Sequence, residues 1–232
     1  MKIFIKRITS VISVGVAALV IAGCITTEQA PNAQMSGFLG DYSQLHRGKS
    51  GQAEFTYRDR NADLNKYNKV ILEPVQLWAV EGKDSALSSL SREDQQLLVD
   101  YLYVSLSDAL KRDYAIVNEP GPEVMKIRCA ITEAKATSPV KEILSTVTPY
   151  GLGISYAKHF ALGTHSGVGV VSVEGELLDS VTGARLAAVV DRRAGTKSLA
   201  DKYTRWGDVQ DAFSFWARRM QTNLALLRAD KN

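Results

Sequence analysis

The chain has 232 residues, of which 45% are hydrophobic and 23% are charged, a composition typical of a globular protein. It carries 28 lysines and arginines against 25 aspartates and glutamates. Three of the positive residues, Lys2, Lys6 and Arg7, lie in the first 23 residues, which hold no acidic residue. The rest of the chain is therefore formally neutral, which argues against a nucleic-acid-binding protein and against electrostatic attachment to a membrane.

The first predicted element is an N-terminal secretory signal peptide. Its positive residues are followed by an apolar stretch over residues 8–23, which Ser10, Ser13 and Gly15 interrupt. A membrane-spanning helix needs about 20 mainly apolar residues with anchored flanks. This stretch is shorter, and residues 24–34 just after it contain no lysine or arginine. The pattern predicts an export signal over residues 1–23 that is removed.

The segment ends in a sequence that resembles the bacterial lipobox, in which an aliphatic residue and two small residues precede a cysteine. The matching residues are Ile21, Ala22, Gly23 and Cys24. The resemblance implies that a lipoprotein signal peptidase recognises residues 21–23 and cuts before Cys24. It also implies that the thiol and the new amino group of Cys24 receive acyl chains such as palmitate. Several chains would anchor the protein permanently, since one alone binds marginally. An ordinary signal peptide and an uncleaved anchor are the alternatives.

The same resemblance predicts a destination. Bacterial lipoproteins that lack an aspartate directly after the acylated cysteine usually reach the outer membrane, and Ile25 occupies that position here. We therefore expect attachment to the inner leaflet of the outer membrane, with the domain in the periplasm. Residues 24–36 are polar and unpatterned and predict a tether, and residues 37–232 predict a single domain. Once Cys24 carries lipid, Cys129 is the one remaining cysteine, so no internal disulfide is expected.

The first strand and helix of the domain have clear local signals. Residues 69–78 are almost all apolar and predict a strand that is buried on both faces. Residues 91–113 predict a helix, because a stripe of apolar residues recurs at helical spacing. Ser91 can cap this helix, with Asp94 three residues later in the capping-box position.

The second half of the domain reads as strands followed by a helix. A short strand over 114–122 and a half-buried strand over 123–135 precede a hairpin over 167–195 with a glycine-containing turn. The last helix, over 206–230, has apolar residues spaced by three and four from Val209 to Leu227. The order predicts an α+β fold, with a single mixed or antiparallel sheet and both amphipathic helices packed on one face as a two-layer sandwich.

Four stretches resemble an uncharacterised family of bacterial lipoproteins, domain of unknown function 3313. They are "SGFLGDYSQL", "PVQLW", "CAITEAK" and "VEGELLDSVTGARLAAVVDRRAG". This resemblance implies an envelope location and no established activity, so it assigns no catalytic residue. A weaker likeness joins "ELLDSVTGARL" to envelope lipoproteins with a domain like the amino-terminal one of TolB or the curli secretion subunit. In those proteins a sheet-and-helix module mediates contacts between proteins.

No pattern of residues predicts a specific chemistry. His159 and His165 are six residues apart with no acidic residue or cysteine between them, so we expect no metal site and no cofactor. Cys129 lies on the apolar face of its predicted strand and is interpreted as a small core residue. We therefore expect no catalytic residue and no enzyme, although spatial triads leave no trace in one sequence. A periplasmic enzyme and a purely structural outer-membrane lipoprotein are the alternatives.

The stretch over residues 139–167 is the most informative for binding. It combines glycines with five large apolar or aromatic residues, Tyr150, Leu152, Ile154, Tyr156 and Phe160. One interpretation is a connection that folds back and completes the core. The other is an exposed surface for an envelope protein, a second copy or the membrane. We predict a protein-binding or accessory module, attached to the membrane through Cys24, that binds no nucleic acid.

Overall fold

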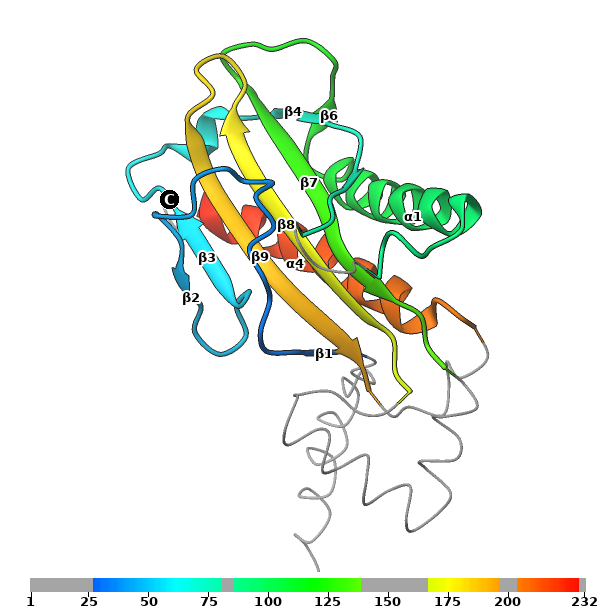
Figure 1. Cartoon of the computed structure of the whole chain (residues 1–232). Coiled ribbons are helices and arrows are strands. Elements are labelled where there is room, and N and C mark those ends of the chain that lie inside the picture. The colour runs from blue at the N-terminus through cyan, green and yellow to red at the C-terminus, as the bar shows by residue number, and fades with distance from the viewer. Residues whose placement is uncertain (1–26, 81–85, 139–166, 197–203, 230–232) are drawn as a thin grey trace, which may run out of the picture.

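The computed structural model describes residues 27–80, 86–138, 167–196 and 204–229, with side chains described as far as Leu226 in the last segment. These residues form one mixed sheet and two long helices (Figure 1), which confirms the predicted α+β fold. The strand order is β2-β3-β9-β8-β7-β4-β6, with β1 paired to β9 and β5 paired to β7. The strands are β1 (Thr27–Gln29), β2 (His46–Arg47), β3 (Phe55–Arg58), β4 (Lys69–Leu72), β5 (Gln76–Leu77), β6 (Ala115–Ile116), β7 (Val124–Lys135), β8 (Val170–Asp179) and β9 (Arg185–Gly195).

The centre of the sheet is an antiparallel meander of β7, β8 and β9. The predicted hairpin is present, and its turn needs Gly183, whose φ of 72° lies in the left-handed region that favours glycine. Asp179 ends β8 and accepts hydrogen bonds from the backbone N–H groups of Val181 (3.0 Å) and Thr182 (2.9 Å), which hold the turn. The sheet is mixed because β4 and β5 pair parallel to β7.

Both long helices cover one face of the sheet, as predicted. They are α1 (Arg92–Leu110) and α4 (Gly207–Ala229), and a short 3-10 helix, η1 (Leu64–Lys66), lies nearby. Ser91 caps α1 as the sequence indicates, since its side chain accepts a hydrogen bond from the Asp94 N–H (3.1 Å). The core between helices and sheet contains residues from both helices and the central strands: Leu98, Leu102, Leu106, Val209, Phe213, Leu224, Ile127, Ile131, Val171 and Val173.

Trp206 joins the two helices at their N-terminal ends. Its side chain is buried, and its indole Nε1 donates to Asp94 Oδ1 (2.7 Å) while Arg205 Nη1 donates to the other carboxylate oxygen (2.7 Å). The indole hydrogen bond, followed by those of Ser91 and Arg205, holds the pKa of Asp94 below its ordinary value. Besides its place at the Ser91 cap, the Asp94 carboxylate therefore links α1 to Arg205 and Trp206, the two residues just before α4.

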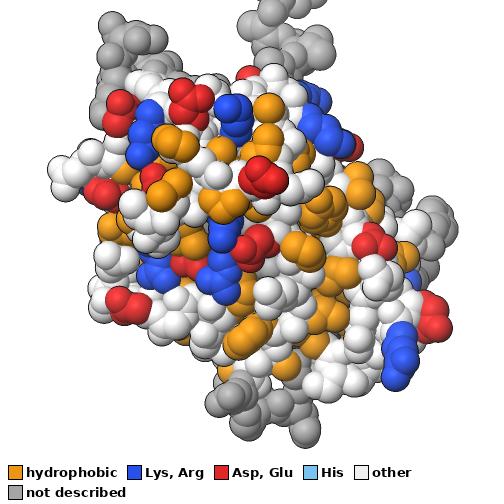
Figure 2. Space-filling view, turned by 90° about the horizontal axis from the view of Figure 1, so that it is seen from above, with side chains coloured by type: hydrophobic (Ala, Val, Ile, Leu, Met, Phe, Trp, Pro, Cys, Tyr) orange, Lys and Arg blue, Asp and Glu red, His pale blue; other side chains and the backbone are white. Residues whose placement is uncertain are grey.

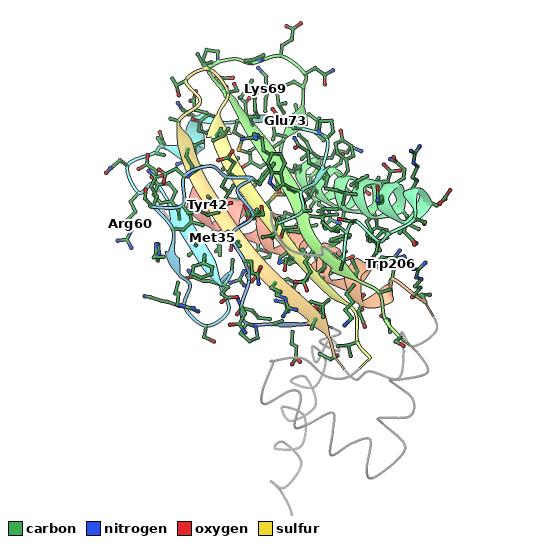
Figure 3. All side chains as sticks on the ribbon, in the orientation of Figure 1. Met35, Tyr42, Arg60, Lys69, Glu73 and Trp206 are labelled. Atoms are coloured by element: carbon green, nitrogen blue, oxygen red, sulfur yellow. The ribbon has the colours of Figure 1, made fainter. Side chains whose placement is uncertain are left out.

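The opposite face of the sheet is covered by the N-terminal segment. Phe38 and Leu39 pack on Ala188 and Val190 of β9. Tyr42 and Met35 lie in front of the sheet, while α4 lies behind it (Figure 3). The sequence predicted a tether over residues 24–36, but in the structure residues 27–36 belong to the fold. β1 pairs with residues 193–195, and Ala30 is fully buried, so only residues 25 and 26 lie between Cys24 and the first described strand.

Ion pairs cross the outer face of the sheet near β4 and β5. Glu73 pairs with Lys126 and Arg128 (3.5 Å each), and the buried Glu176 pairs with Arg128 (2.5 Å) and Arg185 (2.9 Å). Seen from above, this end of the molecule shows basic and acidic side chains next to one another among hydrophobic ones (Figure 2). Three basic side chains thus share two carboxylates on this face of the sheet.

Candidate functional site

The predicted site residues at the N-terminus and in the long connection lie outside the described residues. These are Ile21, Ala22, Gly23 and Cys24, and the surface formed by Tyr150, Leu152, Ile154, Tyr156 and Phe160. They remain predictions. Within the described ranges, no group of three or more His, Cys, Asp or Glu side chains is arranged to hold a metal ion. Two other features of the described residues are suited to binding, one on α1 and one between α4 and the sheet.

The first feature is an exposed apolar stripe on α1, formed by Leu97, Tyr101 and Val104 and called here the α1 stripe. The three residues are four and three apart, so they lie on one side of the helix. Their exposed fractions are 42%, 36% and 53%. Leu97 and Val104 lie beside the stripe of Leu98, Leu102 and Leu106 that fills the core, and one side of the Tyr101 ring contacts Phe213 of α4 (6.3 Å between ring centroids).

Acidic residues border the α1 stripe. Glu93, Asp100 and Asp108 are exposed on the same helix, three or four residues from a member of the stripe. An apolar surface with a charged border is typical of a protein interaction site. Asp108 is paired with Lys111 (3.5 Å), so Glu93 and Asp100 supply the acidic edge, and the stripe fits a partner surface that is apolar at its centre and basic beside these two residues.

The second feature is a groove between α4 and the helix-facing side of the sheet, called here the sheet groove. One row of directly paired residues crosses its floor: Thr56 on β3, Val189 on β9, Gly175 on β8 and Cys129 on β7. Gly175 leaves the row open at its middle. A Cβ atom added there would lie 3.6 Å from the Arg128 carbonyl oxygen, 3.7 Å from Val189 Cγ2 and 3.9 Å from Cys129 Sγ, which are ordinary contact distances.

The sheet groove is large and mostly apolar. Its volume is about 1280 Å³. Trp216, Met220 and Leu224 of α4 form its roof, and Leu102 and Leu106 of α1 close it at the β7 side. Although β9 is an interior strand, the Val189 side chain keeps 36% of its surface exposed, because that surface faces the groove. The small residues of the floor thus leave space that the helices do not fill.

Two groups in the groove have the chemical types needed for catalysis, but their surroundings suit a structural role. Burial raises the pKa of the Cys129 thiol to about 12, so it stays protonated at neutral pH and is a poor nucleophile. Asp191 accepts hydrogen bonds from Gln29 Nε2 (2.9 Å), the Glu54 N–H (3.0 Å) and Trp216 Nε1 (2.8 Å). These three donors occupy the carboxylate.

Arginines line the open side of the groove, where α4 faces β3 and β1. Arg193 stacks on Phe215, with its guanidinium carbon 3.6 Å from the ring centroid, and donates to the Thr27 carbonyl (2.7 Å). Burial lowers the pKa of Arg193 from its ordinary value. Arg219 donates to the Gly51 carbonyl, and Arg58 and Arg218 also line the groove.

The lining charges are positive in balance. Arg128 and Glu176 pair with each other through side chains on the outer face, where Arg128 lies over the Phe38 ring. The other charged lining residues are Asp191 and the arginines 58, 193, 218 and 219. The groove therefore joins an apolar interior to a cationic opening.

Sequence reasoning missed both features. A glycine inside a strand is a known sign of close approach or missing packing, so Gly175 was the signal available for the groove. For α1, the apolar residues Leu97, Tyr101 and Val104 exceed what one core-facing stripe needs. The prediction for Cys129 as an apolar-face residue of β7 is confirmed, since it packs against the core beside Ile127 and Ile131.

Comparisons with known proteins give a family and distant structural likenesses. The model of the family described as protein of unknown function (DUF3313) matches residues 34–220. No curated protein matches the chain. A PelC dodecamer from Paraburkholderia phytofirmans is 13% identical, with 72% of this chain and 94% of that chain covered and a TM-score of 0.38. A candidate lipoprotein from Caulobacter crescentus is 17% identical, with 72% and 92% covered and a TM-score of 0.33. A DUF4136 family protein from Bacteroides thetaiotaomicron is 10% identical, with 75% and 95% covered and a TM-score of 0.34.

Proposed function

Because the chain belongs to the DUF3313 family, whose function is unknown, we propose from its residues that it is a lipid-anchored lipoprotein of the bacterial envelope that binds a protein partner through α1. In this proposal Cys24 holds the chain in the inner leaflet of the outer membrane, and the domain faces the periplasm. The exposed α1 stripe with its acidic border is the observation that carries the binding function.

The position of β1 supports the anchoring. β1 begins at Thr27, three residues after Cys24, and Thr27 Oγ1 donates to the Ala194 carbonyl (3.0 Å). An extended chain spans at most about 3.6 Å per residue, so three residues reach about 11 Å. Acyl chains on Cys24 would therefore hold the domain directly against the bilayer. No helix in the described part of the chain is both long and apolar enough to cross a membrane.

Replacing Cys24 by alanine tests the anchor. Wild-type protein should incorporate labelled palmitate and appear in outer-membrane fractions of a density gradient. Cys24→Ala should carry no label and keep residues 1–23, because the acylated cysteine is the substrate for cleavage. Cys129→Ala is the matched control and should label like the wild type. Label that persists in Cys24→Ala would contradict acylation at this residue, and labelled protein confined to inner-membrane fractions would contradict the destination.

The α1 stripe is tested by photo-crosslinking in cells. A photoreactive amino acid at position 101 should give a discrete protein adduct, identified by mass. Leu97→Asp combined with Val104→Asp should abolish the adduct, since both carboxylates would lie at the apolar centre of the contact. Because these side chains are exposed, the free energy of unfolding should change by no more than about 1 kcal/mol. Val181→Asp, at an exposed apolar residue of the β8–β9 turn, is the control and should keep the adduct.

The outcome separates the candidate partners. An adduct at twice the mass of the chain would identify a second copy, and a heavier or lighter adduct would identify another envelope protein. An adduct that survives the double substitution would contradict docking on the α1 stripe. A purely structural lipoprotein would give none.

The proposal is a binding module, and two groups in the sheet groove support it over an enzyme. Burial raises the pKa of the Cys129 thiol, which disfavours the nucleophilic thiolate, and the Asp191 carboxylate accepts three hydrogen bonds. Activity of the purified protein on an envelope substrate that Cys129→Ala removes would contradict this part of the proposal.

A further inference from the structure

We infer that the sheet groove binds an anionic phospholipid, with its acyl chains over the row of Val189, Gly175 and Cys129 and its phosphate at the arginines of the opening. This site is separate from the α1 stripe and does not depend on a partner there.

The floor of the groove suits acyl chains. It runs across three strand spacings, from β3 through β9 and β8 to β7, a distance of about 14 Å at the usual separation of neighbouring strands. Gly175 has no side chain, and the side chains next to it, those of Val189 and Cys129, present only apolar or weakly polar atoms. A flexible chain can fill such a space, whereas a rigid polar ligand would leave its own groups without partners.

The volume of the groove favours a large ligand. Sites for drug-sized molecules are about 300–1,000 Å³, and this groove measures about 1280 Å³. Part of it is open to solvent between α4 and β3, which leaves room for a headgroup outside the apolar floor. A phospholipid combines these two parts in one molecule.

The charges at the opening favour a phosphate. Arginine guanidinium groups bind phosphate oxygens through paired hydrogen bonds. Arg219 and Arg218 come from α4 and Arg58 from β3, so they approach the opening from both of its sides. Asp191 keeps its negative charge and acts on Arg193, but the arginines 58, 193, 218 and 219 outnumber it among the lining residues. A zwitterionic lipid carries the same phosphate but adds a cation of its own, which the arginines would repel, so the positive balance of the opening favours an anionic lipid.

The position of the opening also fits a membrane lipid. Thr27 and Gln29 of β1 line the groove beside Arg193, at the end of the domain where the chain continues toward Cys24. A lipid leaving the bilayer at that end would meet the arginines first and the apolar floor next.

The test uses phosphatidylcholine vesicles that contain one of two lipid probes. One probe is phosphatidylglycerol and the other is phosphatidylcholine, and each carries a photoactivatable acyl chain. Full-length mature protein is reconstituted into the vesicles, irradiated and digested, and the adducts are mapped by mass. Adducts on Val189 and Met220 are expected from the phosphatidylglycerol probe, and about tenfold fewer from the phosphatidylcholine probe. Equal labelling by both probes, or labelling confined to residues outside the groove, would overturn the proposal.

Filling the floor should remove the adducts. Gly175→Leu places a side chain in the open row without a backbone clash, and it should reduce labelling of the groove about tenfold. Ala184→Leu adds the same side chain at the exposed turn before β9 and should label like the wild type. The thermal midpoint of Gly175→Leu shows whether it is folded. If it is not, Val189→Phe blocks the next position of the same row. Unchanged labelling in a folded blocked variant overturns the proposal.

Further variants test the role of the arginines and of the anchor. Arg218→Gln with Arg219→Gln should lower labelling by the anionic probe to the level of the neutral one. Arg60→Gln, at an arginine on the outer edge of the molecule (Figure 3), should not. If the protein's own acyl chains filled the groove, acylated protein would give no adduct and unacylated Cys24→Ala would give one. That result would overturn the proposal in favour of the anchor as the occupant.

Discussion

Replacing Asp179 by asparagine should lower the free energy of unfolding by about 2–3 kcal/mol at neutral pH, because hydrogen bonds to a charged group contribute more than those to a neutral one. The carboxylate accepts from the Tyr67 hydroxyl (2.6 Å), Lys66 Nζ (3.0 Å) and the Thr182 hydroxyl (3.1 Å). It also accepts from two backbone N–H groups of the β8–β9 turn. An asparagine side chain offers one oxygen and presents N–H groups to the remaining donors.

The loss should depend on pH in a defined direction. The Tyr67 hydroxyl, followed by the Thr182 N–H, holds the pKa of Asp179 far below its ordinary value. In the unfolded chain an aspartate has a pKa of about 3.9. The stabilisation is therefore complete above that pH and is lost as the pH falls toward the folded-state pKa. The difference between wild type and Asp179→Asn should shrink as the pH is lowered from about 5 to about 2.

Urea denaturation at a series of pH values measures this difference. Asp108→Asn is the control, because Asp108 is two-thirds exposed and its ion pair with Lys111 lies on the surface of α1. Its effect should be within about 0.5 kcal/mol at every pH. A constant difference between wild type and Asp179→Asn across the range would show that the hydrogen bonds at the turn do not depend on the charge of Asp179.

Replacing Glu174 by alanine should cost about 3 kcal/mol and release the N-terminal segment from the outer face of the sheet. Glu174 is fully buried and accepts hydrogen bonds from the Ser36 N–H (2.5 Å) and the Tyr42 hydroxyl (2.6 Å). Without the carboxylate, the buried Ser36 N–H and the half-buried Tyr42 hydroxyl would lose their acceptor, and a cavity would remain where the side chain was. Both effects destabilise the contact between the N-terminal segment and the sheet.

Hydrogen exchange of residues 30–45 measures the release, and urea denaturation measures the overall cost. Exchange there should rise in Glu174→Ala by more than in the central strands, because the segment can open without unfolding the sheet. Glu123→Ala removes a carboxylate that is about half exposed and should leave both measurements unchanged. Equal acceleration in all strands would show that the segment opens only with the whole fold.

The sequence predicted the elements whose signals are local. The alternation of Met125, Ile127 and Cys129, the glycine of the hairpin turn and the spacing of apolar residues from Val209 to Leu224 each arise within one element. Local patterns survive in one sequence because the residues that form them are neighbours in the chain. The single mixed sheet with two helices on one face follows from these elements and their order.

What could not be predicted depends on contacts between distant residues. Glu174 and Glu176 lie in an apolar run at positions that a hairpin would normally turn to solvent, but the segment around Phe38 covers them. Residues 27–29 carry no strand pattern, and only their pairing with residues 193–195 makes them a strand. The sheet groove likewise depends on the register that places Val189, Gly175 and Cys129 in one row.

β1 can join the sheet only after β9 has formed, since its partners are residues 193–195. Closing a loop of this length costs entropy that no local contact offsets beforehand, so this pairing belongs to the last steps of folding. We therefore expect β1 to stay unpaired during synthesis and export until nearly all of the domain has emerged. On the proposed pathway the enzymes that cleave and acylate Cys24 would meet an unfolded substrate. Maturation would precede folding, and the closing of β1 onto β9 would then bring the domain up to its anchor.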